Sequence, residues 1–287
     1  MNGIYWLASY PKSGNTWFRI FLANLLSDKD EPVDINNMGI RNTIASNRGM
    51  FDELIGYDSS DLTMDEIDSL RPDLYSLFAK IDDNIKYLKI HDAYTKLNDG
   101  RNIIPNDGTL GALYIIRNPL DVAVSFANHS QITIEKSVDR MCEADFSFCR
   151  KDDVMSIQLR QKLLSWSGHV KSWTEQTDMK VHVIRYEDMK KKPYETFKSS
   201  IEFLGLNDKL DKLERAIGFS DFKIVKKQEE ENGFIEKPVK AESFFREGET
   251  ASWKKYLNKE QINKIIENHK EVMIKFGYLT KDDEIIE

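Results

Sequence analysis

The segment Ile4 to Trp17, Ile-Tyr-Trp-Leu-Ala-Ser-Tyr-Pro-Lys-Ser-Gly-Asn-Thr-Trp, passes from an apolar run through a short polar turn into a helical pattern. The run from Ile4 to Ala8 predicts a strand buried on both faces. Helical spacing begins at once after the turn, with apolar residues at Trp17, Ile20, Phe21, Leu22 and Leu25. The turn, Pro11 to Thr16, therefore lies at the amino end of a helix.

This turn has the features of an anion site. Backbone N–H groups at a helix amino end point outward with the positive end of the dipole, Lys12 adds a cation, and Gly14 permits a close approach. Phosphate is the expected ligand. One alternative is a triphosphatase P-loop, but that pattern needs Gly-Lys-Ser/Thr, whereas the order here is Lys-Ser-Gly. Another is an ordinary strand-to-helix turn, with Thr16 as the helix N-cap.

Further strands are predicted at 85–90, 110–116 and 181–184. Helices are predicted to begin near residue 121 and to cover about 154–175, 194–204 and 210–217. Residues 30–84 are polar, with weak helical patches such as 74–81, and are expected to lie outside the central sheet as a long connection. Alternating strands and helices indicate an α/β fold with a mostly parallel central sheet and helices on both faces. With 287 residues and 40% apolar content, one P-loop-like domain spanning 1–287 is expected.

Charge and cysteine content exclude several classes of function. A net charge of −7 argues against nucleic acid as a partner, because phosphate backbones are bound by basic surfaces. Cys142 and Cys149 lack the spacing of a metal site and are expected to be reduced thiols, and no metal is expected. No basic leader and no run of about 18 apolar residues is present, so neither export nor a membrane span is expected and the predicted location is cytoplasmic.

Tyr10-Pro-Lys-Ser-Gly-Asn-Thr-Trp17 resembles the 5′-phosphosulfate loop of the cytosolic-type sulfotransferases, which use 3′-phosphoadenosine 5′-phosphosulfate (PAPS). The family usually has Thr where this chain has Asn15, and Asn also offers a side-chain donor. The resemblance implies that PAPS is bound by the loop residues Lys12, Ser13, Gly14, Asn15, Thr16 and Trp17.

A second buried strand ends in a cation at Arg117, where open α/β sheets bind ligands. Asn118-Pro119-Leu120-Asp121 then turns into a helix that carries Ser125. By themselves, Arg117 could pair with a carboxylate and Ser125 could face solvent. The pattern Arg-Asn-Pro-x-Asp-x-x-x-Ser nevertheless resembles the family's 3′-phosphate motif, which implies that Arg117 and Ser125 hold that phosphate. A guanidinium suits a terminal phosphate by bidentate hydrogen bonding.

Lys89 and His91 stand two residues apart on a predicted strand and so share one face. The Lys-x-His pattern resembles that of the family, which implies that His91 is the catalytic base. Lys12 and Lys89 would then stabilise charge on the leaving phosphate and the sulfuryl oxygens. His169, His182 and His269 are interpreted as structural, whereas His129 could line the pocket or lie on the surface.

The resemblance continues to the carboxyl terminus, where it is weaker. Tyr186, Ser220 and Phe222 match the family's adenine side. The segment Phe244 to Lys254 resembles the family's loop that closes over the 3′-phosphate, so such a loop is predicted near 240–254. The resemblance implies that Arg246, Glu247 and Gly248 contact the nucleotide. Glu247 replaces a Lys, and a carboxylate beside a phosphate repels it unless it points away. The animal members' dimer motif is not evident, so the oligomeric state is open.

The sequence predicts a PAPS-dependent sulfotransferase acting on a hydroxyl or amine of a small acceptor. An ATP-dependent kinase, which would need acidic magnesium ligands, and a non-catalytic nucleotide-binding module are the alternatives. The acceptor cannot be identified, and residues 30–84 and 132–153 are expected to shape its pocket. Aromatic residues that could form pocket walls or equally belong to the core are Phe51, Tyr57, Tyr75, Phe78, Phe146 and Phe148.

Overall fold

A computed structural model describes residues 2–39, 43–151, 154–238 and 241–286. The chain forms two compact units, each made of three separate segments. The first unit comprises Met1–Tyr10, Thr43–Tyr114 and Glu143–Val183, and the second comprises Pro11–Asn42, Ile115–Cys142 and Ile184–Glu287. The prediction of one domain over 1–287 is not decided by this division and stays a prediction.

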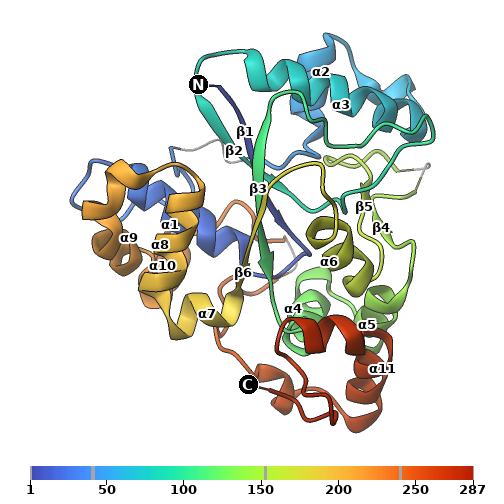
Figure 1. The fold of residues 1–287 in the computed structure, drawn as a ribbon, viewed down its shortest axis with the longest axis vertical. Coiled ribbons are helices and arrows are strands. Elements are labelled where there is room, and N and C mark those ends of the chain that lie inside the picture. Colours follow the sequence, from blue (N-terminus) through green and yellow to red (C-terminus); the bar gives the residue numbers. More distant parts are fainter. Residues whose placement is uncertain (1, 40–42, 152–153, 239–240, 287) are drawn as a thin grey trace. The chain divides into compact units, whose positions relative to one another are not determined.

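The first unit contains most of the strands, drawn in Figure 1 with the helices α2, α3 and α6. Its elements are β1 (Gly3–Ser9), α2 (Arg48–Ile55), the short 3-10 helix η1 (Ser59–Asp61), α3 (Met64–Lys80), β2 (Ile85–Ile90), β3 (Thr109–Ile116), β4 (Ser147–Phe148), β5 (Gln161–Lys162), α6 (Trp166–Thr174) and β6 (Val181–Arg185). The last residues of β3 and β6 already belong to the second unit.

The second unit is helical (Figure 1). Its elements are α1 (Asn15–Leu26), α4 (Pro119–Ser130), α5 (Ile134–Cys142), α7 (Tyr186–Lys191), α8 (Pro193–Phe203), η2 (Asn207–Lys212), α9 (Leu213–Phe219), α10 (Phe222–Asn232), η3 (Ser252–Lys255) and α11 (Lys259–Lys275). Helix α1 packs against α9, and α4 packs against α5 and α11. Apolar residues of α1, α10 and the connecting loops form one buried cluster that includes Ile20, Val225 and Phe245.

The four longer strands form a sheet in the order β2-β1-β3-β6. β1 and β2 are parallel, with Gly3 opposite Ile85 and Ala8 opposite Ile90. β1 is almost wholly buried, and β3 is buried from Gly111 onward, as continuous apolar runs require. The predicted α/β class with a central parallel sheet flanked by helices is confirmed.

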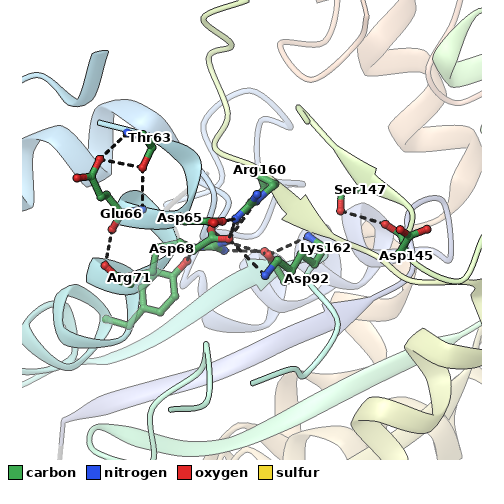
Figure 2. A network of polar contacts seen from close by, with 12 residues as sticks. Thr63, Asp65, Glu66, Asp68, Arg71, Asp92, Asp145, Ser147, Arg160 and Lys162 are labelled. Carbon is green, nitrogen blue, oxygen red and sulfur yellow. Dashed lines mark hydrogen bonds and ion pairs between the residues drawn. The ribbon is translucent and has the colours of Figure 1, made fainter. Parts of the chain in front are cut away.

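A network of buried charges lies between α3, β5 and the end of β2 (Figure 2). Arg71 binds both carboxylate oxygens of Asp92, with distances of 3.0 Å and 2.7 Å, and both side chains are fully buried. Arg71 also donates to Asp68, which pairs with Arg160, and Arg160 in turn pairs with Asp65. Burial raises the pKa of Asp92, while the Arg71 guanidinium opposes that rise. The network anchors Asp92 directly after His91.

Two predicted segments differ from the structure. The helix expected over 154–175 is present only as α6, because the residues before it bond to distant segments: Leu159 N–H donates to Ser46 O, and β5 pairs with β4. Residues 30–84 are less irregular than expected. They contain α2 and α3, and α3 is fixed by a capping box between Thr63 and Glu66.

Other expectations concern side chains. Cys142 and Cys149 are free thiols, as predicted. Four of the six aromatic candidates for the acceptor pocket, Phe51, Tyr75, Phe78 and Phe146, are buried, whereas Tyr57 is exposed and Phe148 half-buried. Parts of the predicted pocket and closing segments, residues 40–42, 152–153 and 240, lie outside the described residues. In the part of the chain that the structure describes, no helix has the length and apolar character needed to cross a membrane.

Candidate functional site

The Pro11 to Thr16 turn curls at the amino end of α1. Lys12 (φ 69°) and Gly14 (φ 103°) both adopt left-handed backbone conformations, and Gly14 is the residue before the helix, the position that the ordinary-turn alternative gave to Thr16. A Cβ on Gly14 would lie 2.6 Å from Cδ2 of Tyr186, so only glycine fits. Left-handed residues of this kind turn consecutive N–H groups into an anion-binding concavity.

Several buried polar atoms in this region, Glu247 Oε2 among them, have no hydrogen-bond partner among the described residues, and two of these atoms are hydrogen-bond donors. Ser13, 1% exposed, has an unpartnered Oγ, and Arg117, 9% exposed, has an unpartnered Nε. Buried donors are almost always paired, because an unpaired one costs about 1–3 kcal/mol. Both atoms belong to the two segments predicted to hold phosphates.

Arg117 follows β3 and is held on several sides. Its Nη1 donates to Lys12 O at 3.2 Å, its Nη2 donates to Glu249 O at 3.1 Å, and its guanidinium carbon lies 4.2 Å from the centre of the Tyr186 ring. Arg117 therefore connects the phosphate loop with the carboxyl-terminal loop. Its Nε–H has no partner among the described residues, and each Nη retains a second N–H, so the guanidinium can still donate to a ligand.

The turn after Arg117 is fixed by buried acids. Glu187 accepts from the Asn118 N–H at 3.0 Å and from the Tyr278 hydroxyl at 3.0 Å, and burial raises the pKa of its carboxyl. In the first turn of α4, Asp121 accepts from two N–H groups and one hydroxyl of the carboxyl-terminal loop: Ala251 N at 2.8 Å, Trp253 N at 3.0 Å and Ser252 Oγ at 3.0 Å. Asp121 thus fastens this loop to the helix that carries Ser125.

The residues predicted for the adenine side lie around Trp17. Trp17 Nε1 donates to Ser220 O at 2.8 Å, and its ring packs edge-on against Tyr186. The Ser220 hydroxyl is occupied within the protein, because it donates to Ala216 O at 2.7 Å and accepts from Asn24. Ser220 therefore supports Trp17 through its carbonyl.

The carboxyl-terminal loop brings Gly248 to Phe222. A Cβ on Gly248 would lie 2.3 Å from Phe222 Cδ2, and Gly248 O accepts from the Tyr186 hydroxyl at 3.3 Å. Glu247 Oε1 accepts from the Tyr256 hydroxyl at 2.7 Å, and Arg246 stacks over the Tyr256 ring.

The remaining predicted phosphate residues are less strongly tied to this group. Thr16 Oγ1 donates to Glu236 Oε2 at 3.4 Å, and Asn15 is buried. Ser125 is half-buried on α4. The structure thus brings together the loop, Arg117, Tyr186 and Gly248.

Lys89 and His91 lie in the first unit, where β2 runs beside β1. Both side chains are half-buried, and Leu88 and Ile90 between and beside them are buried, as the predicted alternation requires. His91 Nδ1 lies 2.8 Å from Ser9 O and 3.4 Å from Ser9 Oγ. A carbonyl oxygen only accepts, so Nδ1 carries the proton and a neutral His91 has its lone pair on Nε2.

A family model described as "Sulfotransferase domain" matches residues 4–277. The chain belongs to the sulfotransferase family. Rat sulfotransferase 2A2 is 25% identical over 260 residues, covering 88% of this chain and 77% of the rat protein. Cytosolic sulfotransferase 5 of Arabidopsis thaliana is 26% identical over 274 residues, covering 90% of this chain and 76% of the plant protein.

Solved structures show the same fold. A mouse sulfotransferase complexed with PAP, 3′-phosphoadenosine 5′-phosphate, has a TM-score of 0.58 and 21% identity, covering 94% of this chain and 84% of that one. Retinol dehydratase in complex with androsterone and the inactive cofactor PAP has a TM-score of 0.57 and 18% identity, covering 99% and 82%. The predicted family, the sulfotransferase class of enzyme and the fold are therefore confirmed.

The other histidines of this sulfotransferase have distinct surroundings. His169 and His269 are buried, and burial lowers the pKa of each to about 4. His182 is half-buried in β6, and burial lowers its pKa as well. The His129 ring packs edge-on against Phe244. These positions agree with a structural role for the first three.

The sequence did not predict several contacts between lysines and aromatic rings that surround the motifs of the second unit. The Lys12 ammonium lies 4.0 Å from the centre of the Phe244 ring, and Lys190 lies over both Trp17 and Phe222. Lys190 lies on α7, as Tyr186 does. Its aromatic contacts are more than 30 positions away in the sequence, so no local pattern indicates them. No group of three or more His, Cys, Asp or Glu side chains suited to a metal occurs within the described ranges.

Proposed function

We propose that this sulfotransferase takes its sulfuryl group from PAPS and that the second unit binds it. The observation that carries this proposal is the pair of buried, unpartnered atoms, Ser13 Oγ and Arg117 Nε, beside the curled loop at the start of α1. A ligand with one phosphate on the loop and another on Arg117 satisfies both atoms. PAPS has its phosphates at the 5′ and 3′ positions, which matches two anion sites in one unit.

In the proposed arrangement, the 5′-phosphosulfate lies on Lys12, Ser13, Gly14, Asn15 and Thr16, and the 3′-phosphate lies on Arg117 and Ser125. The adenine lies by Trp17, Tyr186 and Phe222, which the packing of Gly14 and Gly248 holds in place. Arg246 and Gly248 would close over the 3′-phosphate. Glu247 Oε1 accepts from the Tyr256 hydroxyl, whereas its buried Oε2 has no partner among the described residues, so in this arrangement Glu247 contacts the phosphate through its main chain.

His91 is the proposed base. Its Nε2 lone pair takes the proton of the acceptor hydroxyl or amine, the acceptor oxygen or nitrogen attacks sulfur, and the bond from sulfur to the phosphate oxygen breaks as 3′-phosphoadenosine 5′-phosphate leaves. Lys12 and Lys89 stabilise the charge that gathers on the phosphate and the sulfuryl oxygens. Ser9 accepts a hydrogen bond from His91, and only Tyr10 and Pro11 separate Ser9 from Lys12 in the sequence.

We infer a small-molecule acceptor, as the name flavonol 3-sulfotransferase indicates for the Flaveria bidentis relative. The single domain, the acceptor pocket formed by residues 30–84 and 132–153, and the cytoplasmic location remain part of this proposal. The kinase alternative predicts phosphoryl transfer from ATP with magnesium.

The test compares wild-type protein with His91→Ala and with His182→Ala, a matched half-buried histidine. Transfer from ³⁵S-labelled PAPS to a panel of phenols, alcohols and amines is measured together with binding of 3′-phosphoadenosine 5′-phosphate. A general base contributes roughly 10²–10⁴-fold, so His91→Ala should lose that factor in kcat and keep its nucleotide affinity. Transfer by His91→Ala at the rate of His182→Ala would refute the role of His91.

A further inference from the structure

We propose that His169, which no motif assigns to catalysis, is a positioning residue that fixes the backbone and the tautomer of His91. The inference rests on the proposed role of His91 as base. It is carried by a series of hydrogen bonds within the first unit that the chain link between Ser9 and Tyr10 closes into a ring; the residues lie at the ends of β1 and β2 and on β3 and α6.

The ring begins at His169 on α6. Its Nε2 lies 2.9 Å from His91 O, and because a carbonyl only accepts, Nε2 carries the proton. Its Nδ1 lies 2.8 Å from the Tyr114 hydroxyl, which therefore donates to it. His169 is fully buried, and Tyr114 is fully buried in β3. A neutral imidazole satisfies both bonds, and burial holds His169 in that state by lowering its pKa to about 4.

The ring closes through the chain that precedes the phosphate loop. The backbone of Tyr10 hydrogen-bonds to Tyr114, and the Tyr10 ring packs edge-on against the His169 ring with centres 5.4 Å apart. The residue before it, Ser9, accepts from His91 Nδ1. The path Tyr10, Tyr114, His169, His91, Ser9 therefore returns to its start.

Each bond in the ring has a defined direction, so each imidazole is held in one tautomer. His169 fixes the carbonyl of His91, and Ser9 O fixes the His91 ring with its proton on Nδ1. Trp173 Nε1 also donates to the next carbonyl, that of Asp92, at 3.0 Å. Nε2 of His91 is left as the basic atom. Without the bond from His169, the His91 peptide loses one of its restraints and the ring can shift away from Ser9.

The experiment uses three variants of the full chain. His169→Leu removes both bonds while filling the space, and His169→Gln restores an amide donor for His91 O and an oxygen that can accept from Tyr114. Tyr114→Phe removes only the donor to His169. For each, kcat for sulfuryl transfer, the dissociation constant for 3′-phosphoadenosine 5′-phosphate, the melting temperature and the ¹⁵N NMR shifts of His91 are measured.

We expect His169→Leu to lower kcat about 10-fold or more with nucleotide affinity unchanged within about 2-fold, because small displacements of a catalytic group are costly. The His91 spectrum should change from protonated Nδ1 to a mixture, and Gln should restore both kcat and the spectrum. Tyr114→Phe should lie between Leu and the wild type.

An unchanged kcat in His169→Leu would overturn the inference. A loss of kcat that His169→Gln does not restore, together with a parallel loss of nucleotide affinity and of melting temperature, would also overturn it. His169 would then be merely structural. If His169→Leu does not fold, a wild-type kcat and His91 spectrum in Tyr114→Phe overturn it. Failure of the proposed function itself is separate, because it would appear as full activity in His91→Ala.

Discussion

Breaking the buried pair of Arg71 and Asp92 should be among the most damaging single changes outside the nucleotide site. In Arg71→Met, Asp92 loses two hydrogen bonds of 3.0 Å and 2.7 Å and, among the described residues, keeps the Lys162 N–H at 3.3 Å. Asp92 is fully buried, so water cannot replace the guanidinium. Removing one partner of such a pair costs about 3–5 kcal/mol.

The sign of the pH dependence follows from burial. Without Arg71, the effect of burial, which raises the pKa of Asp92, is opposed much less, because the Lys162 N–H remains but the guanidinium does not. The folded variant then binds a proton at a higher pH than its unfolded chain does, so its stability is lost as pH rises through the folded pKa and is regained as pH falls. The difference in unfolding free energy from the wild type should therefore shrink between pH 7 and pH 5.

Urea unfolding of the wild type, Arg71→Met, Asp92→Asn and the double variant measures these terms. The double variant removes both charges and should recover about 2 kcal/mol relative to Arg71→Met, because pairing energy and burial cost disappear together. A loss below about 1 kcal/mol in Arg71→Met, or a double variant no more stable than that single variant, would refute the reasoning.

Further predictions concern the second unit. Gly14→Ala should weaken binding of 3′-phosphoadenosine 5′-phosphate at least about tenfold in calorimetry, since the new Cβ meets Tyr186 at 2.6 Å; unchanged affinity would contradict this. Asp121→Ala should speed proteolysis at the loop that contains Trp253, because each N–H left unpaired costs about 1–3 kcal/mol, and equal cleavage rates would argue against the clamp. Burial lowers the pKa of His269 to about 4, so as pH falls the unfolded chain protonates this histidine before the folded protein does. The free energy of unfolding should therefore fall between about pH 6.5 and pH 4, by up to about 3 kcal/mol. His269→Gln should show a smaller fall in urea midpoint over that range; an identical fall would exclude this role.

The sheet was predictable because its signal is local. β2 coincides with the predicted 85–90, and the ends of β1, β3 and β6 differ from the prediction by at most one residue. Continuous apolar runs can be buried on both faces only in a central sheet. The phosphate loop at Pro11 to Thr16 and Arg117 could also be predicted from the sequence, because each follows an apolar run.

The missed features depend on partners distant in the sequence. Leu159, Leu163 and Trp166 have helical spacing and are buried, but Leu159 bonds to Ser46 and Leu163 to Phe146. Periodicity cannot distinguish this from a helix. For the same reason, His169 was interpreted only as structural, because its bonds to Tyr114 and His91 join residues 55 and 78 positions apart and leave no local signal.

The central claim is that the second unit recognises a nucleotide with phosphates at both the 3′ and 5′ positions. Calorimetric titration with 3′-phosphoadenosine 5′-phosphate, with adenosine 5′-phosphate and with ATP plus magnesium tests it most directly, with Arg117→Ala as the comparison. We expect the bisphosphate to bind at least about 100-fold more tightly than the other two, and Arg117→Ala to remove most of that preference. Tight binding of ATP, or equal affinity with and without the 3′-phosphate, would contradict the account.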